Sequence, residues 1–90
     1  QSHYSPACQV IIANDLAHAE KLLAQQQSMG NRARIVQFSD DLPIYASTLY
    51  SQMRQADFEG FHSLVAIRPP ETGLGQAILD RLLKASAPRF

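Results

Sequence analysis

The side chains that could bind a metal ion or an anion gather after three short apolar segments. Asp15 follows the first segment, Asp40 and Asp41 follow the second, and Arg68 and Glu71 follow the third. Carboxylate oxygens are the ligands that Mg²⁺ and Ca²⁺ prefer, but Asp also caps helices by accepting backbone N–H groups. Because every acidic residue here falls at an expected helix start or turn, we favour capping over a metal site.

The turn before the last expected helix holds two glycines, Gly73 and Gly75, after the pair Pro69-Pro70. Free N–H groups at a helix start bind phosphate or carboxylate. The chain has neither the dinucleotide fingerprint nor the Walker pattern with its lysine, and the neighbouring carboxylates repel an anion. We therefore expect the glycines to permit a tight turn and close helix–sheet packing. The edge of the expected sheet where these turns gather remains a candidate ligand-binding or docking edge, and its residues are Asp15, Asp40, Asp41, Arg68, Gly73 and Gly75.

The remaining reactive residue types form no recognisable catalytic or zinc motif. His3, His18 and His62 are dispersed, and none has a second histidine four residues away or a nearby cysteine. Cys8 stands before an apolar segment with no activating base beside it, which is typical of an inert packed thiol. No Ser or Thr lies in a nucleophile elbow. The sequence therefore shows no catalytic centre, and we expect neither a metal nor a cofactor in this chain.

Three charged residues on the expected helices lie outside their apolar faces: Arg54, Asp57 and Arg81. Arg54 and Asp57 are three residues apart, so they could pair across one helical turn. Such residues are either a solvated surface pair or part of a docking patch for another domain. The sequence leaves both interpretations open.

The elements that must position these residues alternate between strand and helix. Apolar runs at residues 9–13, 34–38 and 63–67 predict buried strands. Each is followed by a helical pattern, and Gly30 and Gly60 suit the ends of the first two helices. Strands that alternate with helices predict parallel pairing and right-handed crossovers. We expect an α/β fold: a three-layer Rossmann-like sandwich, β-α-β-α-β-α, with a short three-stranded parallel sheet in the order 2-1-3 and helices on both faces.

The helical spacing also predicts which side chains face the sheet. In the second helix the expected inward residues are Ala46, Leu49, Tyr50, Met53 and Ala56. In the third helix they are Leu74, Ala77, Ile78, Leu82 and Ala85.

Size and charge limit the classes of function. The chain has 90 residues, with 8 basic and 8 acidic side chains and a formal net charge of +0. This length predicts one domain. A neutral chain offers no electrostatic reason to bind nucleic acid or an anionic membrane, and no apolar run is long enough to span a bilayer. One cysteine fits a reducing compartment, so we expect a cytoplasmic protein.

Three motifs resemble one family. The first is His3-Tyr4-Ser5-Pro6, the second is Ala46-x-x-Leu49-Tyr50-x-x-Met53-Arg54-x-x-Asp57, and the third is Gly73-Leu74-Gly75-x-Ala77-Ile78-x-Asp80-Arg81-Leu82. In this order they resemble the linker, the second accessory-domain helix and the closing helix of the two-domain L-threonylcarbamoyladenylate synthases. The departures are small: Met53 and Asp80 stand where that family commonly has Leu and Asn. The resemblance implies that residues 1–8 are the end of an interdomain linker and residues 9–90 a Rossmann-like accessory domain.

The same resemblance implies that this chain assists an enzyme reaction whose catalytic groups lie in another domain. The parent enzyme uses ATP, with Mg, together with L-threonine and bicarbonate to make threonylcarbamoyl-adenylate and pyrophosphate. A separate transferase then modifies certain tRNAs. The catalytic domain that does this chemistry would be the partner of this chain, and the accessory domain would bind no nucleic acid directly. By motif match, His3, Tyr4 and Pro6 are implied to be lid residues over the catalytic cleft.

Two other interpretations remain open. One is an independent small-ligand or nucleotide-binding domain with its site at the carboxyl edge of the sheet, where parallel α/β folds place their ligands. The other is a hydrolase whose catalytic groups meet only in the folded chain. Because the predicted edge carries more acid than base, we expect weak ATP binding at most.

Overall fold

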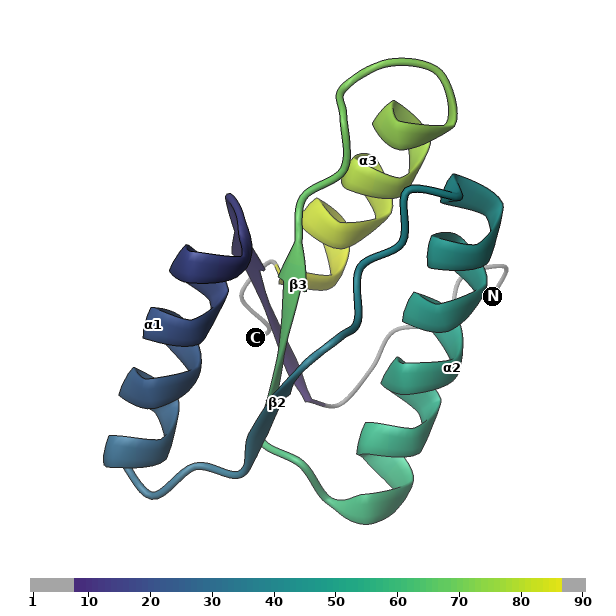
Figure 1. Ribbon diagram of the computed structural model, residues 1–90. Helices are drawn as coiled ribbons and strands as arrows, with labels where there is room; N and C mark the ends of the chain where they lie inside the picture. The colour runs from purple at the N-terminus through teal and green to yellow at the C-terminus, as the bar shows by residue number, and fades with distance from the viewer. Residues whose placement is uncertain (1–7, 87–90) are drawn as a thin grey trace.

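The computed structural model describes residues 8–86 and confirms the predicted α/β class (Figure 1). Three strands alternate with three helices along the chain, in the order β1 (Gln9–Ala13), α1 (Leu16–Ser28), β2 (Ala33–Ile35), α2 (Leu42–Glu59), β3 (Ser63–Ile67) and α3 (Leu74–Ser86). The second strand is shorter than expected and begins one residue earlier. Within residues 8–86, no helix has the length and apolar character needed to cross a membrane.

The sheet is parallel, as predicted, but its strand order is β1-β3-β2 and not the expected 2-1-3. Val65 in β3 lies between Ile11 of β1 and Ile35 of β2. The burial of β3 agrees with this central position, because all residues from Ser63 to Ala66 are buried, as expected of a strand covered on both faces and paired on both edges. Both β1 and β3 read as continuous apolar runs, so the sequence did not distinguish the central strand.

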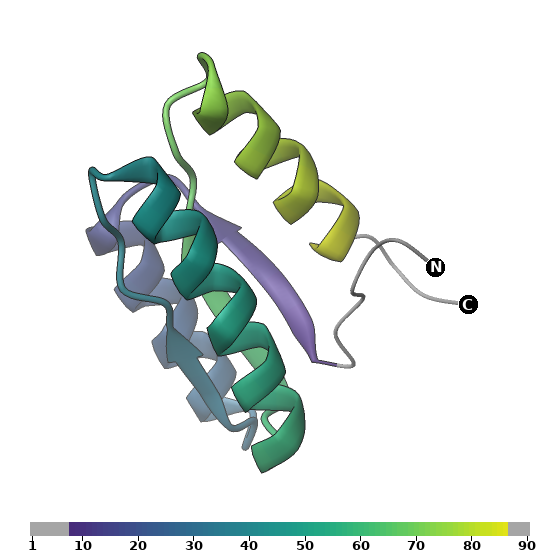
Figure 2. The same cartoon turned by 90° about the vertical axis from the view of Figure 1, so that its right-hand side faces the viewer.

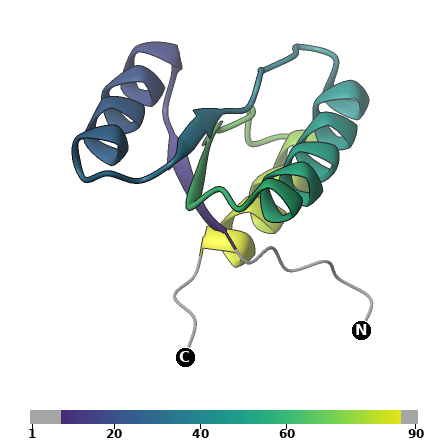
Figure 3. The same ribbon diagram turned by 90° about the horizontal axis from the view of Figure 1, so that it is seen from below.

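The helices cover both faces of the sheet, as predicted, but unequally. α1 lies alone on one face, whereas α2 and α3 lie together on the other, as Figure 3 shows from below and Figure 2 from the side. The larger core cluster is on the α2–α3 face, and its fully buried side chains include Tyr45, Leu64 and Leu82. The smaller cluster, on the α1 face, is built on Ala13, Ala19 and Val65.

Two aspartates and two glycines set the bounds of the first two helices, as the sequence predicted. The Asp15 and Asp41 carboxylates accept the N–H groups of His18 and Ile44 at 2.8 and 3.2 Å, which satisfies donors that the helix leaves free. Gly30 follows the C-cap of α1 with φ of +81°, and Gly60 is the C-cap of α2 with φ of +74°. These left-handed conformations suit glycine because it has no Cβ.

The predicted inward faces of α2 and α3 are partly wrong at their margins. Tyr50 is 47% exposed and Leu74 is 44% exposed, whereas Tyr45, which the helical pattern missed, is fully buried. Ala77 is exposed and Leu79 is buried. The buried stripe of each helix is therefore narrower than the predicted apolar face: it consists of Tyr45, Leu49, Met53 and Ala56 in α2, and of Gly75, Ile78, Leu79 and Leu82 in α3.

Candidate functional site

The carboxyl edge of the sheet is where the chain changes direction between the two faces. The loop after β1 leads to α1 on one face, and the loop after the neighbouring strand β3 leads to α3 on the other (Figure 1). Ligands of open α/β sheets bind at such a switch point. A pocket of about 730 Å³ lies at this edge, lined by residues 14–16, 35–38 and 67–71.

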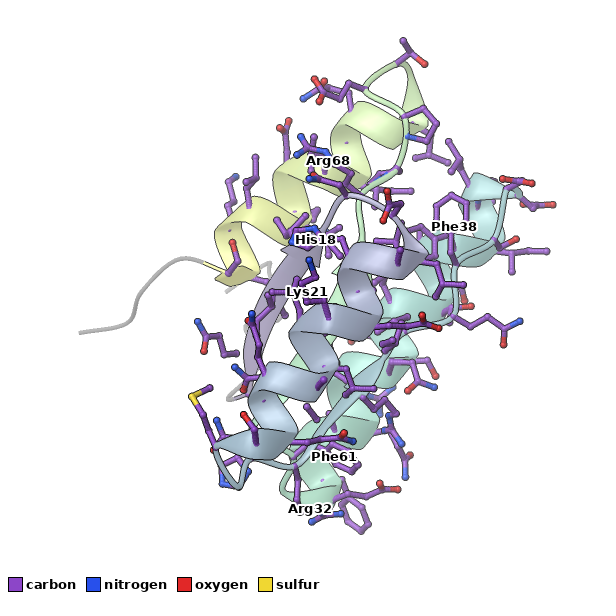
Figure 4. All side chains as sticks on the ribbon, turned by 60° about the vertical axis from the view of Figure 1, so that its left-hand side comes forward. His18, Lys21, Arg32, Phe38, Phe61 and Arg68 are labelled. Carbon is purple, nitrogen blue, oxygen red and sulfur yellow. The ribbon has the colours of Figure 1, made fainter. Side chains whose placement is uncertain are left out.

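The pocket brings together three of the residues that the sequence singled out. Asp15, Arg68 and Glu71 line it. The Arg68 guanidinium donates to the Glu71 carboxylate at 2.9 Å, and both side chains are partly exposed. The Arg68 backbone N–H donates to the Ala13 carbonyl at 2.8 Å and ties the loop after β3 to the end of β1. Figure 4 shows Arg68 and Phe38 at this end of the sheet.

The other candidates for this edge lie outside the pocket lining. Asp41 caps α2, and Asp40 is exposed beside it. Gly73 adopts a φ of +55° in the turn. At Gly75 an added Cβ would lie 1.9 Å from the Pro70 carbonyl oxygen, so this glycine permits close packing of the turn.

The same turn offers little to an anion. The Gly75 N–H donates to the Thr72 carbonyl at 2.9 Å, and the Gln76 N–H donates to the Gly73 carbonyl at 3.1 Å. Backbone donors that bind an anion at a helix start must be free to do so. The geometry therefore supports the packing interpretation of the two glycines.

Sequence reasoning missed the pocket wall contributed by Gln37 and Phe38. We expected both residues in a strand, but β2 ends at Ile35 and the chain then runs as a loop to α2. Phe38 packs on Tyr45 with ring centroids 4.8 Å apart. The available signal was Ser39-Asp40-Asp41, which indicated a turn but not where the strand before it ended.

Tyr45 holds the end of the central strand in place. Its hydroxyl donates to the Ile67 carbonyl at 2.5 Å. Burial raises the pKa of Tyr45 from 10.0 to about 12, because the charged phenolate is poorly solvated there. A neutral, hydrogen-bonded phenol thus fixes the point where β3 leads into the pocket loop.

The donor sets of residues 8–86 do not form a metal site, because nowhere in that range do three His, Cys, Asp or Glu side chains lie close enough to share an ion. Asp15 and Asp41 are occupied as caps. The His18 Nδ1 accepts the Asn14 N–H at 3.0 Å and the His62 Nδ1 accepts the Arg32 N–H at 2.9 Å.

The amino edge of the sheet carries a cluster that sequence reasoning did not find. The guanidinium groups of Arg32 and Arg34 lie 4.4 and 4.5 Å from the ring centroid of Phe61. Arg34 also approaches the Glu59 carboxylate at 3.8 Å, while its Nε and Nη2 are buried without a hydrogen-bond acceptor. Cation–π attraction offsets part of the cost of that burial. Figure 4 shows Arg32 and Phe61 at the end of the sheet opposite Arg68.

The candidate docking residues lie on the α2–α3 side of the domain. The Arg54 guanidinium is 5.6 Å from the ring centroid of Tyr50. The Asp57 carboxylate accepts the Cys8 N–H at 3.0 Å, across 49 residues of sequence. Arg81 and Tyr50 line a groove of about 480 Å³ between α2 and α3.

The lid residues implied by the first motif, His3, Tyr4 and Pro6, lie outside the described residues.

The strand order, the parallel pairing and the switch-point pocket place the chain among the small open α/β domains of Rossmann-like type. The family described as threonylcarbamoyl-AMP synthase, C-terminal domain, matches residues 1–87. The chain belongs to this family of threonylcarbamoyl-AMP synthase C-terminal domains. No curated protein gives a significant match.

Three solved structures are similar to the chain. The crystal structure of P. abyssi Sua5 complexed with L-threonine is 26% identical with a TM-score of 0.78, over 93% of this chain and 29% of that one. A variant of P. abyssi Sua5 with a histidine and a tyrosine replaced by alanine is 25% identical with a TM-score of 0.79, over 90% of this chain and 28% of that one.

The third structure is the C-terminal Sua5 domain of the hypothetical Pyrococcus horikoshii Sua5 protein, 21% identical with a TM-score of 0.66. The match covers 88% of this chain and 93% of that one, and it shows the likeness of fold. The chain spans less than a third of the length of the P. abyssi protein.

Proposed function

We propose that this chain is a non-catalytic accessory domain that regulates a threonylcarbamoyl-AMP synthase by positioning a linker lid over a catalytic domain. The observation that supports this most strongly is the family match over residues 1–87, together with the small share of the P. abyssi protein that the chain spans. The parent reaction would convert ATP, L-threonine and bicarbonate to threonylcarbamoyl-AMP and pyrophosphate, as a step in tRNA modification.

The polar groups of the described residues support a non-catalytic role because they are engaged in holding the fold. His18 and His62 accept backbone N–H groups through Nδ1, and Cys8 is buried at 3% exposure. Asp15 and Asp41 cap helices. None of these side chains forms the hydrogen-bonded nucleophile and base that covalent catalysis needs.

The attachment of the proposed lid rests on the contact between Cys8 and α2. Because the Cys8 N–H donates to the Asp57 carboxylate at 3.0 Å, the point where residues 1–7 join the domain is fixed to this helix. A lid is effective when its anchor is rigid, since binding energy is then not spent on ordering it. In the proposed mechanism, His3, Tyr4 and Pro6 cover the bound adenylate and exclude water, which would hydrolyse this labile intermediate.

The same side of the domain supports a docking role. Phe58 on α2 is 89% exposed, and Arg54 on the same helix stacks on Tyr50. Exposed aromatic and arginine side chains are enriched in protein interfaces. Arg81 lies across the groove from Tyr50. We therefore propose that the surface of Arg54, Asp57 and Arg81 faces the catalytic domain of a longer polypeptide.

A double replacement, Arg54→Glu with Phe58→Ser, tests the docking role in that longer protein. It should make the accessory and catalytic domains unfold in separate thermal transitions, whereas Gln27→Glu, on the exposed surface of α1, should leave the melting profile unchanged. Identical profiles for the double variant and the wild type would place the interface elsewhere.

The test of the non-catalytic role uses the isolated 90-residue chain. Incubated with ATP, L-threonine and bicarbonate, it should release no more pyrophosphate than a blank without protein. Turnover clearly above the blank would show that the chain carries catalytic groups of its own and would contradict the proposal.

A further inference from the structure

The pocket at the carboxyl edge of the sheet has the size of a small-molecule site. Its volume of about 730 Å³ lies within the range of about 300–1,000 Å³ that is typical of ligand pockets. It is formed where the loops after β1 and β3 diverge to opposite faces of the sheet. Neither size nor position is explained by the proposed lid or docking role.

The walls of the pocket are mainly apolar. The Phe38 ring and the exposed Pro70 contribute flat surfaces, whereas Pro69 and Val36 line the pocket but are buried. The other aliphatic lining residues are Leu16, Ile35 and Ile67. Ile35 and Ile67 are partly buried against the small cluster on the α1 face, where a single helix covers the sheet. Such walls favour a ligand with a flat apolar body.

The polar groups around the pocket select the charge of the ligand. Asp15 and Glu71 contribute carboxylates, whereas Arg68 is the cation among the lining residues and is paired with Glu71 at 2.9 Å. A polyphosphate would meet more negative than positive charge, which opposes its binding. Asn14 and Gln37 add amide groups that both donate and accept hydrogen bonds.

We propose that this pocket binds an uncharged heteroaromatic molecule of about the size of a nucleoside. The ring stacks against Phe38 and Pro70, and its polar edge meets the amides and the Arg68–Glu71 pair. This site goes beyond the accessory role and does not depend on a catalytic domain.

Adenosine and AMP are the probes that test the proposal, because they differ only by the charged phosphate. In an NMR titration of the 90-residue chain, adenosine should shift the backbone amide signals of residues 14–16, 35–38, 68 and 71. The signals of Arg32 and Phe61, at the opposite edge, should not move. We expect a dissociation constant of about 1 mM or tighter for adenosine and weaker binding of AMP.

Leu16→Trp is the blocking variant, because Leu16 lines the pocket and is 56% exposed, so a larger side chain fills the site without entering the core. It should weaken adenosine binding by about tenfold or more. Leu83→Trp is the matched control, since Leu83 is 52% exposed on α3 and lies outside the pocket. Its affinity for adenosine should equal that of the wild type.

Glu71→Gln tests the electrostatic part of the argument. Removing this carboxylate releases Arg68 from its ion pair, so the affinity for AMP should rise toward that for adenosine. Three results would overturn the proposal: shifts that are absent or spread over the whole domain, tighter binding of AMP than of adenosine by the wild type, or unchanged adenosine binding by Leu16→Trp. None of these would bear on the lid or docking role, which is measured in the longer protein.

Discussion

The two faces of the sheet differ in how they are covered. On the α2–α3 face, two helices bury large side chains such as Tyr45, Leu64 and Leu82 to 1% exposure or less. On the other face, α1 alone packs its small residue Ala19 against Ala13 and Val65 of the sheet, with half-buried isoleucines around them. The switch-point pocket opens beside this thinner layer, between the start of α1 and the loops that follow β2 and β3.

The domain therefore has a supporting face, which α2 and α3 cover, and an accessible face, which α1 covers alone. The large apolar area on the α2–α3 face accounts for most of the hydrophobic stabilisation, since that stabilisation grows with the area removed from water. The α1 face contributes less, and the space left at its carboxyl end is available to a ligand. Variants on the two faces should therefore have clearly different effects on folding.

The largest expected effect is that of Gly75→Ala, where α3 of the supporting face begins. The new Cβ would lie 1.9 Å from the Pro70 carbonyl oxygen, so the loop or the helix must move. We expect a loss of about 3 kcal/mol or more in the free energy of unfolding, measured by urea denaturation. The control is Gly60→Ala, which meets nothing within 4 Å at a φ of +74° and should cost about 1 kcal/mol because a Cβ is strained in this left-handed conformation. Equal losses would contradict the close packing at Gly75.

The next prediction compares one leucine replacement on each face of the sheet. Leu64→Ala, at 1% exposure on the supporting face, should cost about 3 kcal/mol because it leaves a cavity. Leu22→Ala on α1, where the leucine is half-buried, should cost about 1 kcal/mol because less apolar area is lost. Both are measured by urea denaturation at the same pH. A larger loss for Leu22→Ala would mean that the α1 face, and not the α2–α3 face, supports the fold.

A smaller and pH-dependent effect is expected at Tyr45. Its folded pKa of about 12 lies above the unfolded value of 10.0, so the native state favours the neutral phenol. The resulting stabilisation is complete below pH 10.0 and is lost as the pH rises toward about 12. Tyr45→Phe should cost about 1 kcal/mol at neutral pH, through the lost bond to Ile67.

The difference in the free energy of unfolding between wild type and Tyr45→Phe, measured by urea denaturation, should therefore narrow at about pH 11, because only the wild type has an ionisable phenol at position 45. A difference in the free energy of unfolding that stays constant between neutral and alkaline pH would indicate that the Tyr45 hydroxyl is not held in its neutral form.

The sequence predicted the fold class because its signals were local. Asp15, Asp41 and Gly60 stand at the helix ends that they were expected to form, and the alternation of strands and helices required parallel pairing. The strand order depended on a different kind of information. Two apolar strands of equal length compete for the central position, and only long-range packing decides between them.

The site was predicted in part for a similar reason. Asp15, Arg68 and Glu71 reach the pocket because parallel strands bring their carboxyl ends to one edge. Phe38 was missed because β2 ends early. Tyr50 was expected to face the sheet but is 47% exposed, whereas Tyr45, which the helical pattern missed, is fully buried. The contact between Cys8 and Asp57 spans 49 residues, and no local pattern indicates it.

The measurement that tests the central claim most directly is the effect of Tyr4→Ala on a longer polypeptide that contains the catalytic domain. Pyrophosphate release with ATP, L-threonine and bicarbonate should fall, because the proposed lid no longer excludes water. The same change in the 90-residue chain should leave its thermal midpoint nearly unchanged, because residues 8–86 already supply a buried core on each face of the sheet. Unchanged turnover, with a midpoint several degrees lower, would contradict the account and make Tyr4 a core residue.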